Sequence, residues 1–267
     1  MKADKVLFIT QEIIPYVPET PMARMGRKLP QLVQESGRQI RTFMPRWGNI
    51  NERRNMLHEV IRLSGMNIII DDTDHTLVIK VASIQQARMQ VYFIDNDDYF
   101  QNRGMLADEE GTEYPDNIER AIFYARGVLE TVKKLRWIPD VIHCHGWISA
   151  VAPLLIKKAY HNEPAFQDTK VVFSVYGETP KNNPAANFRE CLKFRNIDDQ
   201  LLDNTNIDFS SPDALAQLAV TFSDGLIQTE EGVAVETLDF ARKIGKPILE
   251  YPGEPTSDAY TAFYETL

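Results

Sequence analysis

The alternation of strand-length apolar runs with helical patterns is the feature that most limits the folds open to this chain. Such alternation is typical of an α/β architecture, in which a mostly parallel sheet carries helices on both faces. Strands are predicted at residues 5–10, 39–45, 66–70, 76–81, 91–94, 141–145, 170–175, 225–228 and 247–251. Helices are predicted at residues 22–36, 117–135, 149–160, 212–223, 230–244 and 257–267.

Length and charge narrow the range of partners. The chain has 267 residues, 43% of them hydrophobic, and can bury a full core as one large domain or as two small ones. We expect one domain over residues 1–267. The formal net charge of -9 argues against non-specific binding to nucleic acid or anionic membranes. Small molecules, neutral polymers and proteins are therefore the expected partners.

Cysteine content and hydropathy bear on where in the cell the protein is expected. Cys144 and Cys191 are too few for a disulfide framework. No apolar run approaches the roughly 18 residues of a membrane-spanning helix, and the N-terminus enters a strand without the features of a signal peptide. We therefore expect a cytoplasmic protein that binds neither nucleic acid nor membrane.

Three connecting segments differ in what they predict. The short sequence DDTDH between the strands at 66–70 and 76–81 predicts a hairpin. Residues 95–115 are rich in Asp, Asn, Glu and Gly, and residues 177–211 carry turn signals without clean periodicity. Loops this long in a compact domain are usually functional, so candidate binding residues are expected there.

The turn after the first strand stands where a nucleotide-binding α/β domain places its phosphate loop. Such loops use glycines, so that the backbone approaches phosphate at a helix N-terminus. This chain has Pro18, Glu19, Thr20 and Pro21 there instead. The prolines remove two N–H donors and Glu19 adds negative charge, so the turn is hostile to a pyrophosphate.

Several motifs, taken in order, resemble the bacterial glycogen synthases and plant starch synthases, which are GT-B glycosyltransferases. The resemblance covers roughly the first two thirds of the chain and implies a Rossmann-like domain similar to the N-terminal half of a GT-B enzyme. The motifs that carry it are Glu12 and Pro15 (E-x-x-P), Leu29 and Pro30, MPRWG at 44–48, FIDNDDYFQNRG at 93–104, YPDNIERAIFYARGVLE at 114–130 and PDVIHCHGW at 139–147.

The donor-side positions of that family are replaced here. The family's first turn reads K-x-G-G-L-x-D-V and faces the phosphates and sugar of ADP-glucose. The corresponding positions in this chain are Pro18 for the lysine, Thr20 and Pro21 for the glycines, and Arg24 for the aspartate. The final histidine of H-x-H-D-W-H, expected beside the transferred glucose, is Ile148. The resemblance therefore implies a degenerate donor site, and we assign no catalytic residue.

The resemblance also implies a departure in architecture. GT-B enzymes have two Rossmann-like domains with the active site in the cleft between them. Nothing after Gly225 is long enough for the second domain, whereas YTAFYETL resembles the final helix that packs back onto the first domain. We expect residues 256–267 to form such a closing helix.

Polar and aromatic residues of the acceptor side form the candidate glucan site. Trp147 stacks on a sugar or lies in the core, and these two alternatives carry equal weight. The later strand, which ends T-I-H-N in the family, ends here in Tyr176 and Gly177. The candidate glucan contacts are Tyr114, Asp116, Asn117, Arg120, His145, Trp147 and Tyr176.

Structural explanations compete with these roles. Asp116 is also expected to cap the helix at 117–135, with Glu119 completing a capping box. Arg120 and Arg126 are either solvated residues of the helix face or partners of the acidic run at 95–98, and internal ion pairs with that run are preferred. His143 and His145 are preferred as hydrogen-bonded histidines, because no third ligand with convincing spacing suggests a metal.

Other catalytic templates are unsupported. The chain has no G-x-S-x-G elbow and no G-x-x-x-x-G-K-[ST] loop, and the carboxylates of residues 95–113 are best interpreted as an exposed acidic loop.

Three hypotheses follow from the residues and the resemblance. We favour a non-catalytic module, without cofactor or metal, that binds α-glucan or regulates a full-length synthase. The alternatives are an active glucosyltransferase completed by another chain and a protein-interaction domain without sugar binding; the oligomeric state stays open.

Overall fold

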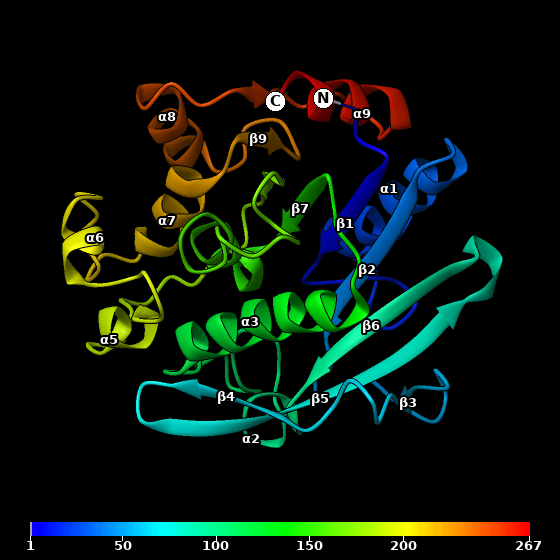
Figure 1. Ribbon diagram of the computed structural model, residues 1–267, viewed down its shortest axis with the longest axis horizontal. Helices are drawn as coiled ribbons and strands as arrows, with labels where there is room; N and C mark the ends of the chain where they lie inside the picture. Colours follow the sequence, from blue (N-terminus) through cyan, green and yellow to red (C-terminus); the bar gives the residue numbers. More distant parts are fainter. Residues whose placement is uncertain (1) are drawn as a thin grey trace.

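The computed structural model describes residues 2–267, and within this range ten strands form one mixed sheet (Figure 1). The strand order is β10-β9-β8-β7-β1-β2-β6-β5-β3, with β4 paired to β5. All pairs from β10 to β6 are parallel, and only β5 pairs antiparallel. The bounds are β1 (Lys5–Ile9), β2 (Gln39–Pro45), β3 (His58–Glu59), β4 (Met66–Ile70), β5 (Thr73–Ile84), β6 (Met89–Asp95), β7 (Val141–His145), β8 (Lys170–Val175), β9 (Gly225–Gln228) and β10 (Ile248–Leu249). The prediction of a mostly parallel α/β sheet is confirmed.

Helices cover both faces of this sheet. On one face α1 packs against α9, and on the other α3, α4, α7 and α8 pack in succession (Figure 1). The helices are α1 (Pro21–Glu35), α2 (Asp97–Phe100), α3 (Asn117–Leu135), α4 (Ala152–Leu154), α5 (Phe188–Leu192), α6 (Asp199–Asp203), α7 (Ala214–Phe222), α8 (Val235–Lys243) and α9 (Ser257–Thr266). None of these helices combines the length and the apolar character that crossing a bilayer requires.

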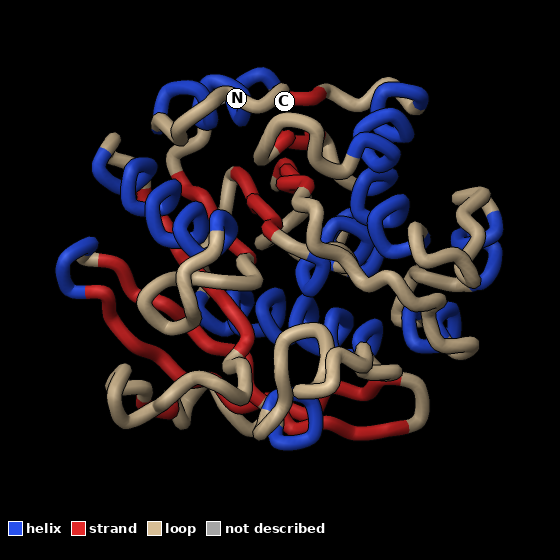
Figure 2. Tube along the Cα trace, turned by 180° about the vertical axis from the view of Figure 1, so that it is seen from behind, coloured by secondary structure: helices blue, strands red, loops and turns tan. Residues whose placement is uncertain are grey.

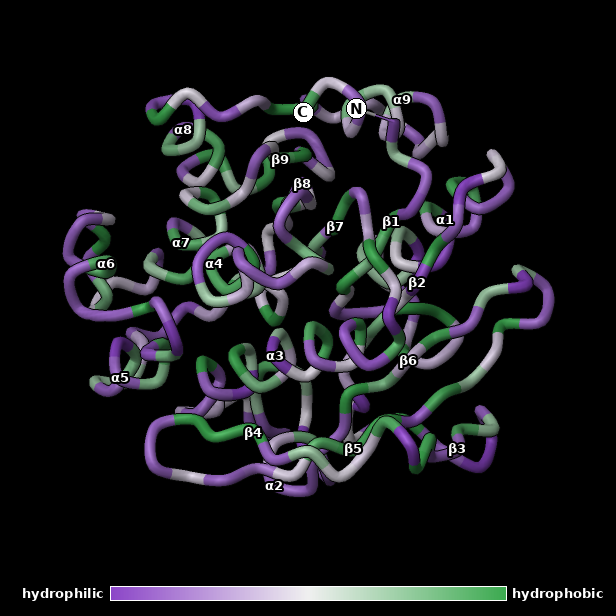
Figure 3. The backbone as a smooth tube through the Cα atoms, in the orientation of Figure 1, coloured by the Kyte–Doolittle hydropathy of each residue, from purple (hydrophilic) through white to green (hydrophobic). Residues whose placement is uncertain are grey.

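The central strands are buried on both sides. Every residue of β7 is buried, and β1 and β8 are buried except for their first residues. This explains their continuous apolar runs, because a parallel strand covered by helices on both faces has no polar side. Figure 3 shows hydrophobic residues concentrated on these strands and on α4 and α7.

The predicted hairpin is confirmed, with a longer second strand. β5 begins at Thr73 rather than at 76, because Ile70 pairs with Thr73 and leaves only Asp71 and Asp72 in the turn. Asp71 has φ 51°, the left-handed conformation that tight hairpin turns need. β5 runs on to Ile84 because it pairs with β6 along its second half.

The predicted helix at 149–160 is wrong in its regularity. The segment consists of a 3-10 turn at Trp147–Ser149, the short α4, and a π-helical turn at Leu155–Ala159. Pro153 explains the interruption, because it has no N–H to donate to the carbonyl of Ser149. Short helices α2, α5 and α6 also lie within the two long loops, and Figure 2 shows how small they are beside α1 and α3.

Candidate functional site

The sheet has one point where its strand order reverses. After β1 the chain adds β2 and then β6 on one side of β1, and it later returns to place β7 on the other side of β1. Helix α1 follows β1 on one face, and α3 precedes β7 on the opposite face. In open α/β sheets ligands bind at the carboxyl ends of the strands at such a point. The segments after β1, β7 and β8 therefore frame the candidate site.

The segment after β1 is held rigidly by the core. The Tyr124 hydroxyl donates to the carbonyl of Thr10 at 2.7 Å, and the Trp47 indole N–H donates to that of Gln11 at 2.7 Å. Gly26 of α1 lies against the next carbonyl, since a Cβ there would be 2.1 Å from the Glu12 oxygen. A side chain at position 26 would therefore push α1 away from this segment.

The N-terminus of α1 is already satisfied by protein groups. The Thr20 hydroxyl accepts from the Ala23 N–H at 2.9 Å and donates to the carboxylate of buried Glu12. Pro21, the first helical residue, has no N–H. Arg24 pairs with Glu19 at 2.8 Å on the surface, and Pro18 is exposed. The end of the helix that would attract phosphate therefore offers few free donors and faces a carboxylate.

The two histidines of β7 are buried and hydrogen-bonded. His143 bonds the Tyr264 hydroxyl at Nδ1 and the Ser174 hydroxyl at Nε2, each at 2.7 Å. His145 Nδ1 bonds the Tyr176 hydroxyl at 3.0 Å, and the two imidazole centroids lie 3.9 Å apart. Burial lowers the pKa of His145 to about 3 and that of His143 well below its usual range, so both rings are neutral at neutral pH.

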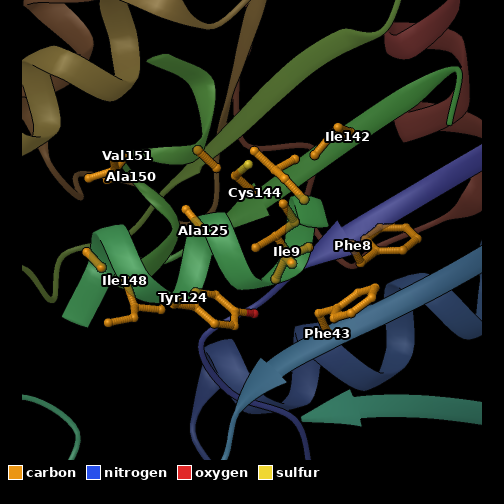
Figure 4. Close-up of a cluster of buried hydrophobic side chains, with 14 of the residues drawn as sticks. Phe8, Ile9, Phe43, Tyr124, Ala125, Ile142, Cys144, Ile148, Ala150 and Val151 are labelled. Atoms are coloured by element: carbon orange, nitrogen blue, oxygen red, sulfur yellow. The ribbon is translucent and has the colours of Figure 1, made fainter. Parts of the chain in front are cut away.

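Ile148 lies in the core rather than at the site. Its side chain is fully buried, and Figure 4 shows it beside Tyr124 among the apolar residues under α3. The preceding Gly146, with φ 81°, turns the chain sharply after β7; a Cβ there would lie 2.5 Å from the Gln11 side-chain oxygen. At position 148 this chain therefore presents no group that transfers a proton or binds a sugar.

Beyond the ends of β7 and β8 lies a cavity of about 280 Å³, here called the Trp147 cavity. Aromatic side chains form its inner wall and acidic residues of the following segments lie around it. Its lining includes Trp147, Phe173, Tyr176, Glu178, Pro180, Pro212, Asp213, Leu215, Ala216, Glu236 and Thr237. The aromatic wall combined with carboxylate acceptors suits a ligand that has apolar faces and hydroxyl edges.

A second cavity of about 200 Å³, the Tyr114 cavity, adjoins the first. Pro180, Pro212 and Leu215 line both, so the two cavities share a boundary. The Tyr114 cavity is also lined by Glu113, Tyr114, Asn117, Asn182 and Asn183. Among the described residues, the linings of the two cavities include four carboxylates and no Lys, Arg or His.

Among the acidic residues that line the Trp147 cavity, Glu178 is the one bonded to the segment after β1. The buried Gln11 amide donates to Glu12 at 3.0 Å and to Glu178 at 3.3 Å. Burial and the neighbouring Glu12 raise the pKa of the Glu178 carboxyl above its usual range. Asp213 and Glu236 line the same cavity, which has no basic side chain in its described lining, so an entering anion would meet negative charge and a neutral hydroxyl would meet hydrogen-bond acceptors.

The structure brings four of the candidate glucan contacts to these cavities. Tyr114 and Asn117 line one, and Trp147 and Tyr176 line the other. Trp147 is only 2% exposed, so its ring forms part of the wall and does not offer a free face for stacking. His145 lies behind Tyr176 as its hydrogen-bond partner.

Asp116 and Arg120 have structural partners, and two expectations about them are wrong. Asp116 makes no capping bond but pairs with Arg103 through both carboxylate oxygens, and Glu119 accepts from the Tyr99 hydroxyl at 3.0 Å. Arg120 is fully buried and does not pair with the acidic run: it donates to the carbonyls of residues 99, 104 and 105 and to the Asn117 side chain. Arg120 therefore has no surface available for a sugar.

Arg126 also does not pair with the acidic run. It donates to the Ile69 carbonyl and lies 3.9 Å from the ring centroid of Phe194. The partners of Asp95 are instead Arg46, at 3.1 Å, and Lys80, at 2.8 Å. Arg46 directly follows β2 and Lys80 lies within β5, and the sequence alone places neither beside Asp95.

Three acidic cavity residues, Glu178, Asp213 and Glu236, were missed by sequence reasoning. Glu178 follows β8, Asp213 is the N-cap of α7 and Glu236 lies in the first turn of α8, so they belong to three separate segments that no sequence pattern groups. The available signal was position: Glu178 follows β8 after a short turn, and the carboxyl ends of parallel strands meet at one edge of the sheet.

Comparisons with known proteins agree with the resemblance inferred from the motifs. A family model described as the starch synthase catalytic domain matches residues 5–245. Glycogen synthases of Pelodictyon phaeoclathratiforme and Chlorobium limicola are 36% and 38% identical over 173 residues, which cover 64% of this chain and 35% of each relative. That of Chlorobium chlorochromatii is 35% identical over 190 residues, covering 70% of this chain and 39% of that protein. The chain thus spans little more than a third of the length of these relatives.

A solved structure supports the same fold. The catalytic domain of starch synthase IV from Arabidopsis thaliana, bound to ADP and acarbose, superimposes with a TM-score of 0.74 at 17% sequence identity. The superposition covers 97% of this chain and 53% of that chain. Because the family model spans most of the chain and the fold agrees, the chain belongs to the glycogen and starch synthase family of GT-B glycosyltransferases.

Proposed function

We propose that this chain binds α-glucan in the joined Trp147 and Tyr114 cavities and does not by itself transfer glucose from a nucleotide donor. The observation that carries the proposal is the composition of the cavity walls. Their described residues include aromatic rings, amides and four carboxylates, without a basic side chain. Such walls favour a neutral polyhydroxyl ligand over an anionic nucleotide sugar.

The turn after β1 supports the second half of the proposal. Thr20 and Pro21 leave little backbone for phosphate to bind, and the Glu12 carboxylate accepts from Thr20 on the inner side of the turn. In proteins, phosphate is usually held by free N–H donors and cations. Ile148 further removes the imidazole that the family resemblance places beside the transferred glucose. A diphosphate donor would therefore bind poorly here, and its sugar would lack that partner.

The partner proposed for this site is the α-glucan itself. A full-length synthase is the alternative partner, and regulation of such an enzyme would follow from shared attachment to one glucan particle. The proposal also predicts that no cofactor or metal is needed for binding. Chelator treatment should therefore leave glucan affinity unchanged.

The decisive measurement is ligand binding to the purified chain. Calorimetry with maltoheptaose should show binding, glycogen should retard the protein in a native gel, and ADP-glucose should give no heat of binding. Incubation with ADP-glucose and a glycogen primer should give no chain extension. Chain extension by the isolated protein would favour the active transferase. Absence of glucan binding, together with co-purification of a full-length synthase, would favour a protein-interaction domain.

A cavity-filling variant locates the site. Ala216 lies half-buried on α7 and lines the Trp147 cavity, so Ala216→Phe places a ring inside it. We expect maltoheptaose affinity to fall about tenfold or more. Gln217→Phe adds a ring at the next position of α7, which lines neither cavity, and should bind as the unmodified chain does. Equal affinity in both variants would place the ligand elsewhere.

A further inference from the structure

We infer that the glucan site continues past Tyr176 into a third cavity beside α1, so that the bound species is a linear chain lying across the carboxyl edge of the sheet. The inference rests on the proposed function and extends it to the side where the family resemblance places the nucleotide donor. It assigns a glucan-binding role to residues of α1 and of the β10–α9 connection.

The third cavity, here called the Tyr251 cavity, has a volume of about 420 Å³. Tyr176 lines both this cavity and the Trp147 cavity, so the two adjoin at one side chain. The other walls come from α1, from the segment after β9 and from the segment before α9. The Tyr114, Trp147 and Tyr251 cavities are therefore arranged in series, with Tyr176 as the second junction.

The Tyr251 cavity contains cations, but they are already engaged. Arg24 pairs with Glu19 at 2.8 Å, and Lys28 pairs with Glu254 at 2.7 Å. Glu230 and Glu231 add two more carboxylates to the lining. A phosphate group would compete with Glu19 and Glu254 for these cations and would still face excess negative charge. The charge arrangement therefore disfavours the anionic donor on this side as well.

The uncharged part of the same lining suits a sugar ring. Tyr251 is 38% exposed, unlike the buried aromatic side chains of the Trp147 cavity. Pro21, Met25 and Pro255 add apolar surface around it. A tyrosine ring combines an apolar face with a hydroxyl edge, which matches the two kinds of surface on a hexose. Tyr251 is thus the expected platform for a sugar unit bound beyond Tyr176.

The serial arrangement predicts a dependence on chain length. A single sugar or a disaccharide can occupy one cavity, whereas a longer linear chain contacts all three at once. Each further occupied cavity adds contacts without a second loss of translational freedom. Affinity should therefore rise steeply between short and long linear oligomers and then level off.

Calorimetric titration of a series of linear α-1,4-linked oligomers, from maltotriose to maltodecaose, tests the inference. We expect maltodecaose to bind at least about tenfold more tightly than maltotriose. Tyr251→Ala should remove about a factor of ten from the affinity for maltodecaose and leave that for maltotriose unchanged. Tyr251→Phe keeps the ring and should behave nearly as the unmodified chain. Ala216→Phe, in contrast, should weaken both ligands.

The possible outcomes separate this inference from the proposed function. If maltotriose and maltodecaose bind equally and Tyr251→Ala changes neither, the extension is wrong while glucan binding stands. If no oligomer binds, the proposed function fails and the extension fails with it. If Tyr251→Ala weakens maltotriose as much as maltodecaose, Tyr251 does not belong to a separate distal site, and the serial arrangement is again wrong.

Discussion

At the scale of single residues, the main surprise is how deeply some polar side chains lie. Arginine is mostly exposed in proteins unless it is paired, so sequence reasoning expected Arg120 to pair with the acidic run at 95–98. Its guanidinium is instead enclosed by carbonyls of the loop after β6, and that loop has no periodicity from which its path could be predicted. Trp147 lines a cavity and is buried, and the sequence alone did not decide between a place in the wall and a stacking platform.

Replacing Arg120 should be costly for stability. Arg120→Met leaves the carbonyls of residues 99, 104 and 105 without their donor, and we expect the free energy of unfolding to fall by about 3 kcal/mol. Arg53 is exposed, so Arg53→Met serves as the matched control and should change stability little. Urea unfolding followed by circular dichroism measures both. An Arg120→Met chain as stable as the original would show that the loop carbonyls find other partners.

At the scale of elements, long periodic segments were predictable and short ones were not. The bounds of β2, β4, β7, β8, β9 and α3 agree with the sequence prediction. Helices α2, α5 and α6 have only 4 or 5 residues each, too few to display a 3.6-residue period. The acidic residues of the cavities come from two loops and from the starts of α7 and α8. Their convergence depends on tertiary structure, so it was not predicted.

The start of α1 provides a prediction at this scale. Thr20→Ala removes the hydroxyl that caps Ala23 and donates to Glu12, and we expect a loss of about 1 to 2 kcal/mol in the free energy of unfolding. Thr20→Ser retains the hydroxyl and should therefore keep most of the stability that Thr20→Ala loses. Thermal and urea unfolding compare the three chains. If serine and alanine destabilise equally, the methyl group rather than the hydroxyl of Thr20 matters.

At the scale of the whole molecule, the class of the sheet followed from sequence but its strand order did not. Local patterns identify strands, yet they do not say that β7 returns to the far side of β1. That return creates the reversal at which the cavities lie. It also buries His143 and His145 at the centre of the sheet, between helical layers.

The buried histidines couple overall stability to pH. Because burial lowers the pKa of His145 to about 3, the unfolded chain takes up a proton more readily than the folded one. The stabilisation is therefore fully present above about pH 6.5 and is lost progressively toward the folded-state pKa. Between pH 6.5 and 5 this amounts to about 2 kcal/mol for His145. The lowered pKa of His143 also makes the folded chain less stable as the pH falls, whereas the raised pKa of Glu178 makes it more stable.

Chemical unfolding at pH 7 and pH 5 tests this coupling. His145→Gln keeps a side chain able to bond the Tyr176 hydroxyl but does not titrate, so its stability should change less between the two pH values. His58 is exposed, and His58→Gln should retain the full pH dependence of the original chain. Identical pH dependence in His145→Gln and the original chain would contradict the assignment.

Tyr176, the side chain that lines both the Trp147 and the Tyr251 cavities, is held in place by buried residues behind it. Its hydroxyl is bonded to His145, which in turn lies against His143, and His143 is bonded to Tyr264 of α9. A side chain held this way does not swing aside when a ligand arrives. Encounter with a sugar chain should therefore proceed at much the same speed for short and long molecules, and their residence times would account for any difference in how tightly they bind.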